Sequence, residues 1–275
     1  MIHLQILRKS SQAQARKQLP PLLAAASRSF SELSSEQSTR SRPAFGIAFD
    51  IDGVLLLGHS PVGGSPRALK RLYDDSGALR IPYIFLTNGG GFPESKRASE
   101  LKELLGVNVS PLQVLQGHSP FKQLVNRFEN ELIVAVGKGE PAAVMSEYGF
   151  QNVLSIDEYA SFFDNIDPLA PYKKWISKEV VCENSSSIKG MTQASSIYSQ
   201  RVQAAFIVSD SVDWSRDIQV LCDILRTGGL PGRELGPQPY LYFANDDLEY
   251  QVSYAVIFRN QLLVLTFMQP SVSFQ

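Results

Sequence analysis

The chain has 275 residues, of which 44% are hydrophobic and 19% are charged, and its formal net charge at pH 7 is −1. This length fits one large globular domain or two modest ones. A near-neutral chain lacks the basic excess that binds nucleic acid. The two cysteines, Cys182 and Cys222, are too far apart for a zinc motif and too few for a disulfide scaffold, which fits a reducing compartment.

Residues 1–43 differ in composition from the rest of the chain. They hold seven basic residues, only two acidic residues and nine serines. A basic, serine-rich and acid-poor beginning is typical of an organelle transit peptide, and a disordered tail is the alternative interpretation. We therefore predict a mitochondrial location, with the chloroplast as the alternative, and keep this segment out of the fold prediction.

From residue 44 on, the sequence alternates between predicted strands and helices. The first elements are a buried strand at 45–49 that leads to Asp50, a glycine-rich loop at 53–64, a helix with Ser65 as N-cap and Pro66 at its first position, a strand at 82–86, and a helix at 94–105 that Gly106 ends. Alternating strands and helices favour a parallel sheet covered by helices. We therefore predict an α/β fold.

The alternation continues more loosely toward the C-terminus. The further predicted elements are a helix from Ser119, a strand at 132–136, a helix at 141–148, a strand at 152–155, a weakly structured connection at 163–200, a strand at 202–208, a helix at 214–227 and a strand at 240–243. Residues 252–268 are apolar, but Arg259, Asn260 and Gln261 make them too polar for a transmembrane segment. One or two strands are expected there.

Two aspartates carry the strongest functional signal. Asp50 and Asp52 lie two residues apart in the run Phe-Asp-Ile-Asp-Gly-Val-Leu, where the first buried strand ends and where open parallel sheets bind their ligands. Two close carboxylates repel each other unless a cation or a proton lies between them, and Mg²⁺ prefers such oxygen ligands. One carboxylate can then attack phosphorus while the other transfers a proton. The alternatives are a surface turn with two solvated acids and the metal-binding acid pair of a glycosyltransferase.

Thr87, Asn88 and Gly89 form a second signal at the end of the strand predicted at 82–86. The Thr87 hydroxyl can donate to a phosphate oxygen, the Asn88 amide can orient a nucleophile or a substrate, and the glycine-rich turn exposes backbone N–H groups. Asn-Gly is also an ordinary turn signal, which is the alternative interpretation. The position of this turn, one strand and one helix after the acidic pair, favours a phosphate-binding role.

Together these motifs resemble those of the haloacid dehalogenase-like hydrolases of subfamily IIA, over roughly residues 45–250. Within the subfamily, the sequence is most similar to the mitochondrial branch of the cat eye syndrome critical region protein 5 type. The resemblance implies an incomplete Rossmann-like hydrolase core at 44–107, an inserted α/β cap domain at 108–250 and an atypical apolar tail at 251–275. It also implies hydrolysis of a small phosphorylated substrate, such as a phosphometabolite or a phospholipid precursor.

The same resemblance assigns a role to each site residue. Asp50 would be the nucleophile that forms an aspartyl-phosphate, and Asp52 would be the acid/base. Mg²⁺ would be held by the Asp50 carboxylate and the Asp52 backbone carbonyl. The phosphoryl group would be bound by Thr87, Asn88 and Gly89.

The later motifs of the family are where this sequence departs from the pattern. The family has a lysine in its third motif and a carboxylate pair in its fourth, whereas no lysine follows Lys189 here. Asn245, Asp246 and Asp247 fit the closing segment of the cap better than a metal site. We therefore expect this chain to be a poor catalyst, since losing one charge-stabilising group typically lowers a rate by about 10²–10³-fold. A catalytically incomplete isoform or a non-catalytic binding protein is the alternative function.

Other polar groups receive plainer interpretations. The run Gly137-Lys138-Gly139 lacks the full spacing of a phosphate loop and fits a strand-to-helix turn better. Asp213 is expected to cap the following helix rather than to bind a ligand together with Asp210. His59 and His118 are expected at the surface.

The composition of the first segment generates a test of location. A fluorescent reporter fused to residues 1–42 should accumulate in mitochondria, because a basic, serine-rich segment of this kind is typical of an import signal. Microscopy beside a mitochondrial dye measures the location, and a reporter fused to residues 44–107 is the control. A diffuse cytosolic signal from the first fusion would contradict the prediction.

Overall fold

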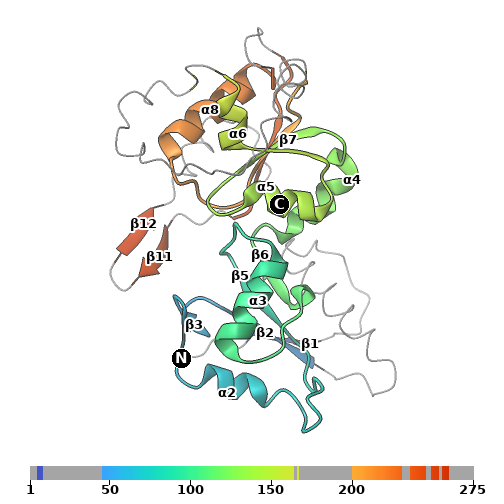
Figure 1. The fold of residues 1–275 in the computed structure, drawn as a ribbon, viewed down its shortest axis with the longest axis vertical. Coiled ribbons are helices and arrows are strands. Elements are labelled where there is room, and N and C mark those ends of the chain that lie inside the picture. The colour runs from blue at the N-terminus through green and yellow to red at the C-terminus, as the bar shows by residue number, and fades with distance from the viewer. Residues whose placement is uncertain are drawn as a thin grey trace, which may run out of the picture. The chain divides into compact units, whose positions relative to one another are not determined.

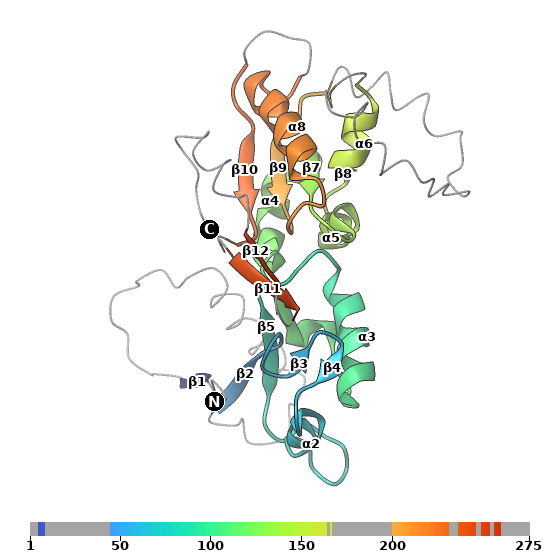
Figure 2. The same ribbon diagram turned by 90° about the vertical axis from the view of Figure 1, so that its left-hand side faces the viewer.

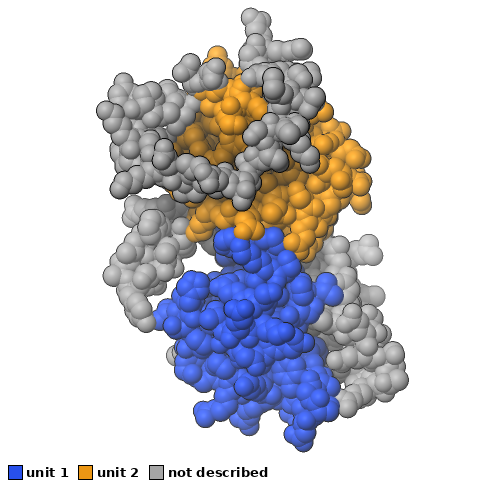
Figure 3. Space-filling view, viewed as in Figure 1, with its two compact units in different colours: residues 1–121, 244–260, 275 blue, residues 122–243, 261–274 orange. Residues whose placement is uncertain are grey.

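The computed structural model describes residues 5–8, 45–163, 166, 200–230, 236–245, 249–253 and 256–259. These residues fall into two compact units, drawn in blue and orange in Figure 3. Unit 1 holds the described residues up to 121 and those from 244 on, and unit 2 holds those from 122 to 243. Within the described residues, no helix has the length and apolar character that a membrane crossing requires.

Unit 1 is built on a four-stranded sheet with the order β1-β2-β5-β6. The strands are β1 (Gln5–Arg8), β2 (Phe45–Asp50), β5 (Tyr83–Thr87) and β6 (Val114–Gln116). β2, β5 and β6 are parallel, and β1 pairs antiparallel with β2 (Figure 1). The strand predicted before Asp50 is confirmed, whereas β6 lies outside every element that the sequence predicts.

Helix α3 (Glu94–Leu105) packs against this sheet. Its buried apolar side chains follow each other at intervals of three and four residues, which places them on one face of the helix. They form one cluster with side chains of β2 and β5: Ala98, Leu101 and Leu105 from the helix, with Ile47, Tyr83 and Phe85 from the strands. The helix ends at Gly106, whose φ of 62° is the left-handed conformation that glycine adopts without strain, as predicted.

The connection from β2 to α2 contains a short hairpin where only a loop is predicted. Its strands and the helix are β3 (Leu56–Leu57), β4 (Ser60–Pro61) and α2 (Ser65–Lys70). The prediction of Ser65 as N-cap is wrong, because Gly64 holds that position and no side chain caps the helix. Ser65 Oγ instead donates to the Leu55 carbonyl at 2.9 Å, which ties the start of the helix to the hairpin.

Unit 2 is a four-stranded parallel sheet with the order β10-β9-β7-β8. Its strands are β7 (Leu132–Val136), β8 (Asn152–Ser155), β9 (Ala204–Ile207) and β10 (Tyr240–Phe243), and its helices are α4 (Val125–Phe128), α5 (Pro141–Tyr148), α6 (Ile156–Ser161) and α8 (Trp214–Arg226). Every side chain of β7 and β9 is buried. This is the pattern expected for central strands of a parallel sheet that is covered on both faces.

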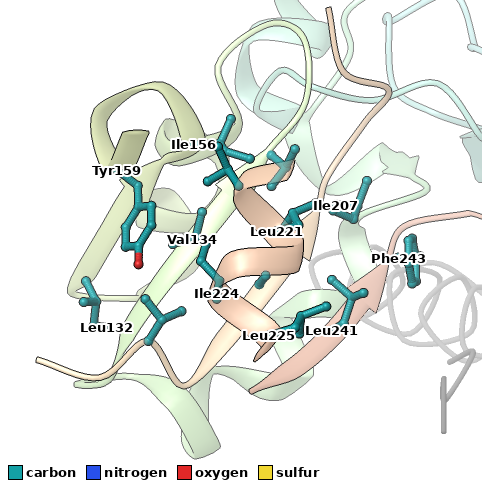
Figure 4. Close-up of a cluster of buried hydrophobic side chains, with 14 residues drawn as sticks. Leu132, Val134, Ile156, Tyr159, Ile207, Leu221, Ile224, Leu225, Leu241 and Phe243 are labelled. Carbon is teal, nitrogen blue, oxygen red and sulfur yellow. The ribbon is translucent and has the colours of Figure 1, made fainter. Parts of the chain in front are cut away.

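The two faces of the unit 2 sheet pack differently. Helices α6 and α8 cover one face, where Tyr159 and Leu221 lie in one cluster with Val134 and Ile207 (Figures 2 and 4). On the other face Phe206 packs against aromatic rings, since successive strand residues point to opposite sides. Its ring centroid lies 5.0 to 6.1 Å from those of Phe128, Phe150 and Tyr242.

The remaining described elements are short. They are the 3-10 helices η1 (Pro111–Gln113) and η2 (Ser119–Leu124), and the antiparallel pair β11 (Glu249–Ser253) and β12 (Val256–Arg259). The α-helix expected from Ser119 is thus a 3-10 helix that continues into α4. Most of the predicted transit segment (all of it except residues 5–8), most of the connection at 163–200 and the tail after residue 259 lie outside the described residues.

Gly137 follows β7 and generates a stability prediction. Its φ is 141°, and a Cβ at this position would lie 2.3 Å from Ser209 Oγ and 2.8 Å from the Ser209 backbone nitrogen. Gly137→Ala should lower the free energy of unfolding by about 2–4 kcal/mol, because the opposing backbone cannot move aside easily. Urea unfolding measures this change.

Gly63→Ala is the matched control, because Gly63 also has a positive φ but no neighbouring atom would crowd the added Cβ. Gly63 has a φ of 53°, and a Cβ at this position would have no atom within 4 Å, so its replacement should cost only about 1 kcal/mol. Equal losses in the two variants would contradict the argument from contact with Ser209.

Candidate active site

Asp50 and Asp52 lie where the chain leaves the sheet of unit 1. Asp50 is the last residue of β2, and Ile51 follows it with a fully buried side chain. The Ile51 carbonyl accepts the backbone N–H groups of Leu55 and Leu56, both at 3.0 Å, which closes a tight turn. Both aspartates therefore remain exposed at the carboxyl edge of the sheet, while the residue between them anchors the turn in the core.

The Asp52 carboxylate contacts the second predicted motif directly. Thr87 Oγ1 donates to Asp52 Oδ2 at 3.0 Å across a sequence separation of 35 residues. The Gly89 backbone N–H donates to Thr87 Oγ1 at 3.0 Å, so the threonine hydroxyl is fixed from two sides. The parallel pairing of β2 and β5 thus brings both motifs to one edge of the sheet.

The glycine-rich turn approaches this carboxylate closely. A Cβ at Gly89 would lie 3.1 Å from Thr87 Oγ1 and 3.4 Å from Asp52 Oδ2, so a larger residue would crowd the site. Asn88 is exposed, and its backbone carbonyl accepts a hydrogen bond from Asn245 Nδ2 at 3.2 Å. The turn is therefore held through its backbone at the position where the sequence predicts phosphate binding.

The pKa of the Asp50 carboxyl is raised above its ordinary value. Partial exclusion of water raises this pKa most, the backbone N–H of Ile51 lowers it, and the negative charge of Asp52 raises it. A cation beside Asp50 would relieve both unfavourable effects. Mg²⁺ commonly binds through one or two carboxylates and keeps several waters, so two acids at one edge fit this ion. No larger group of metal-ligating side chains occurs among the residues that the structure describes.

Arg97 of α3 is a site residue that the sequence does not single out. Its Nη2 lies 3.6 Å from Asp52 Oδ1, and its Nη1 lies 2.6 Å from Glu100 Oε2. His59 is exposed as expected, and its Nδ1 lies 3.3 Å from Glu100 Oε1. Charged residues on a helix surface are common, so nothing in the sequence distinguishes Arg97 from its neighbours.

A network of hydrogen bonds between buried polar groups lies between α3 and β6. Ser119 Oγ donates to Glu94 Oε1 at 2.6 Å and accepts the Gln116 backbone N–H at 2.9 Å. Gln116 Nε2 donates to the Phe92 carbonyl at 2.8 Å. The network links the start of α3 to the end of β6. His118 belongs to the same segment and is fully buried, so its predicted surface position is wrong.

The residues of unit 2 that the sequence analysis weighed as ligand-binding groups form a turn and a helix cap. The Lys138 backbone N–H donates to the Asp210 carbonyl at 2.7 Å, and Ser209 Oγ donates to the Lys138 carbonyl at 2.9 Å. The run around Lys138 is therefore a strand-to-helix turn, as predicted. Asp213 is confirmed as the N-cap of α8, since its side chain accepts the Arg216 backbone N–H at 3.3 Å. Asp246 and Asp247 lie outside the described residues.

Comparison with known sequences gives a family match for residues 47–151, which span most of unit 1 and the first part of unit 2. Residues 47–151 match the family of the haloacid dehalogenase-like hydrolases, a stretch that contains both aspartates and the Thr87 turn. This match agrees with the family expected from the motifs.

Curated relatives and a solved structure agree with this assignment. The chain is 37% identical to a mitochondrial hydrolase of Saccharomyces cerevisiae over 218 residues, which is 77% of this chain and 57% of that protein. It is 27% identical over 232 residues to a fusion of a cardiolipin synthase with a mitochondrial hydrolase in Schizosaccharomyces pombe, covering 82% of this chain and 36% of the fusion. The chain thus spans little more than half of one relative and about a third of the other.

A crystal structure described as a possible sugar phosphatase from Cytophaga hutchinsonii superposes with a TM-score of 0.54 at 12% identity. The superposition covers 82% of this chain and 65% of that chain. At this level of identity the likeness concerns the fold alone, and it confirms the predicted α/β architecture.

The raised pKa of Asp50 generates a prediction on stability. A carboxyl whose pKa is higher in the folded than in the unfolded state favours folding only while protonated, and it destabilises the fold once the pH exceeds its folded pKa. Asp50→Asn should therefore raise the unfolding midpoint at pH 7 in EDTA by about 1–2 °C, because solvent screening leaves less than about 0.5 kcal/mol for an exposed carboxylate. The difference should vanish below the ordinary Asp pKa.

Calorimetry with and without Mg²⁺ completes this test. Mg²⁺ should raise the midpoint of the unmodified protein more than that of Asp50→Asn, since binding to the folded state alone stabilises it. An equal Mg²⁺ effect in both proteins would show that Asp50 is not a ligand.

Proposed function

We propose that this chain carries the site of a Mg²⁺-dependent phosphate-monoester hydrolase that acts through an aspartyl-phosphate on Asp50. The observation that carries the proposal is the contact between the two motifs. Asp52 is held by Thr87 of the neighbouring strand, directly beside Asp50 at the carboxyl edge of the sheet. Two carboxylates in such different surroundings can take two different roles.

In the first half of the proposed reaction, the Asp50 carboxylate attacks the phosphorus of the substrate. The bond between phosphorus and the leaving oxygen breaks, and Asp52 donates a proton to that oxygen. In the second half, Asp52 accepts a proton from a water molecule, which attacks the phosphorus of the aspartyl-phosphate. The P–O bond to Asp50 then breaks, inorganic phosphate leaves, and both carboxyl groups return to their initial state.

The turn after β5 supplies the groups that would bind the phosphoryl oxygens. The exposed Asn88 amide would be the side-chain donor, and Gly89 leaves the space that the phosphoryl group needs. The Thr87 hydroxyl, which donates its proton to Asp52, would hold Asp52 in place beside the phosphoryl group. Mg²⁺, held by the Asp50 carboxylate and the Asp52 backbone carbonyl, would neutralise charge between the acids and the phosphate. Fixed groups of this kind stabilise the charge that develops in phosphoryl transfer.

Unit 2 is proposed as the cap that selects a small phosphorylated substrate. Its compact parallel sheet, which lies between the two segments of unit 1 in the sequence, supports this role. A phospholipid precursor is the favoured substrate class, with another phosphometabolite as the alternative. The support is the relative in which a mitochondrial hydrolase is fused to a cardiolipin synthase.

We also propose a mitochondrial location and membership of the branch of the cat eye syndrome critical region protein 5 type. Both curated relatives are named as mitochondrial hydrolases or as containing one, and neither name points to a chloroplast. A catalytically incomplete isoform or a non-catalytic binding protein is the second candidate.

An assay with Mg²⁺ and 4-nitrophenyl phosphate tests the proposed chemistry. Asp50→Asn should lower turnover by more than about 10³-fold, because the reaction then lacks its nucleophile. The full chain is the right protein for this assay, since β1 near its start completes the sheet beside β2. Asp210→Asn, a change at a carboxylate in unit 2, is the control and should keep turnover within about twofold. Turnover that survives in Asp50→Asn would contradict the proposal.

A further inference from the structure

The two oxygens of the Asp52 carboxylate face different partners. Oδ2 accepts a true hydrogen bond from Thr87 at 3.0 Å, whereas Oδ1 faces the Arg97 guanidinium at 3.6 Å. The longer distance is an electrostatic contact rather than a hydrogen bond. Oδ1 therefore has an electrostatic partner in place of a hydrogen-bond donor, and the carboxylate as a whole is contacted on both sides.

Arg97 is itself fixed independently of Asp52. Its side chain is only 18% exposed, and its Nη1 lies 2.6 Å from Glu100 Oε2, three residues later on the same helix. Ala98 and Leu101 anchor this part of α3 in the core of unit 1. The guanidinium thus presents Nη2 to Asp52 from a rigid support, which is what precise placement of a reacting group requires.

We infer that Arg97 is a positioning residue that aims Oδ1 of Asp52 at the leaving oxygen of the substrate. The inference rests on the proposed function, because it concerns the proton that Asp52 delivers in that reaction. Thr87 fixes the other oxygen, so rotation of the carboxylate about its terminal bond would break both contacts. Without Arg97 the carboxylate keeps one anchor and loses its orientation toward the leaving group.

A purely structural role for Arg97 makes a different prediction. The pair with Glu100 is a partly exposed ion pair between residues three apart on a helix, which stabilises a fold only weakly. Loss of such a pair would affect all substrates alike. Loss of a placed proton donor instead affects substrates in proportion to how much their leaving group needs the proton.

The test compares two esters of similar shape, phenyl phosphate and 4-nitrophenyl phosphate, in Mg²⁺ with the full chain in excess so that a single turnover is measurable. Arg97→Met should lower the rate on phenyl phosphate about tenfold more than on 4-nitrophenyl phosphate, whose leaving group needs little protonation, with KM changed less than about threefold. Arg97→Lys should restore part of the loss, and Asp52→Asn should show the same ester dependence. Glu103→Gln, a change at an exposed carboxylate on the same helix, is the control and should change both rates equally and by less than about threefold.

The outcomes separate this inference from the proposed function. Equal losses on both esters in Arg97→Met, with Asp50→Asn inactive, would overturn the role of Arg97 and leave the phosphatase intact. Turnover that survives Asp50→Asn would overturn both. Unfolding midpoints of Asp52→Asn, Arg97→Met and the double variant give a readout without catalysis. Shifts that add up independently would show that the two side chains do not interact, and would also overturn the inference.

Discussion

The parallel pairing of β2 with β5 is the constraint on which the site depends. Its register places Phe49 opposite Phe85 and Asp50 opposite Leu86, so that the two motifs leave the sheet side by side. A shift of one residue would remove Tyr83 and Phe85 from the cluster that they form with α3. It would also move Thr87 away from Asp52. The apolar side chains that fix the register therefore also determine the distance between the proposed acid/base and its hydroxyl partner.

The two acids differ because the structure surrounds them differently. Asp52 has a hydroxyl donor on one oxygen and a guanidinium near the other. The pKa of Asp50 is instead raised by desolvation and by the negative charge of Asp52, while the backbone N–H of Ile51 lowers it. A cation beside Asp50 would offset both the desolvation and the negative charge of Asp52.

The sequence predicts the fold best where continuous apolar runs are bounded by turn residues. The strands at 132–136, 152–155 and 240–243 and the helix at 141–148 have the predicted bounds. The strand β6 was missed because three residues are too few to show a period. Helix α6 could have been found, since Ser155 and Glu158 form a capping box whose sequence pattern is recognisable.

The sequence also predicts some residues of the candidate site and misses others. Asp50, Asp52 and Thr87 stand out because polar groups directly after a buried strand have few structural explanations. Ser65 did not follow the capping rule, because the Leu55 carbonyl competes successfully for its hydroxyl. Arg97 depends on a contact across 45 residues of sequence, and no local pattern encodes such a contact.

Helix α3 contributes both to the core of unit 1 and, through Arg97, to the candidate active site. One face of the helix packs Ala98, Leu101 and Leu105 on the sheet, and its first residue, Glu94, enters the buried network with Ser119. Arg97 precedes Ala98 directly, so its guanidinium moves whenever the packing of that face changes. A reacting carboxylate oriented from a packed helix is held more rigidly than one oriented from a loop. Substitutions in the core beneath α3 are therefore expected to change the placement of Arg97 beside Asp52.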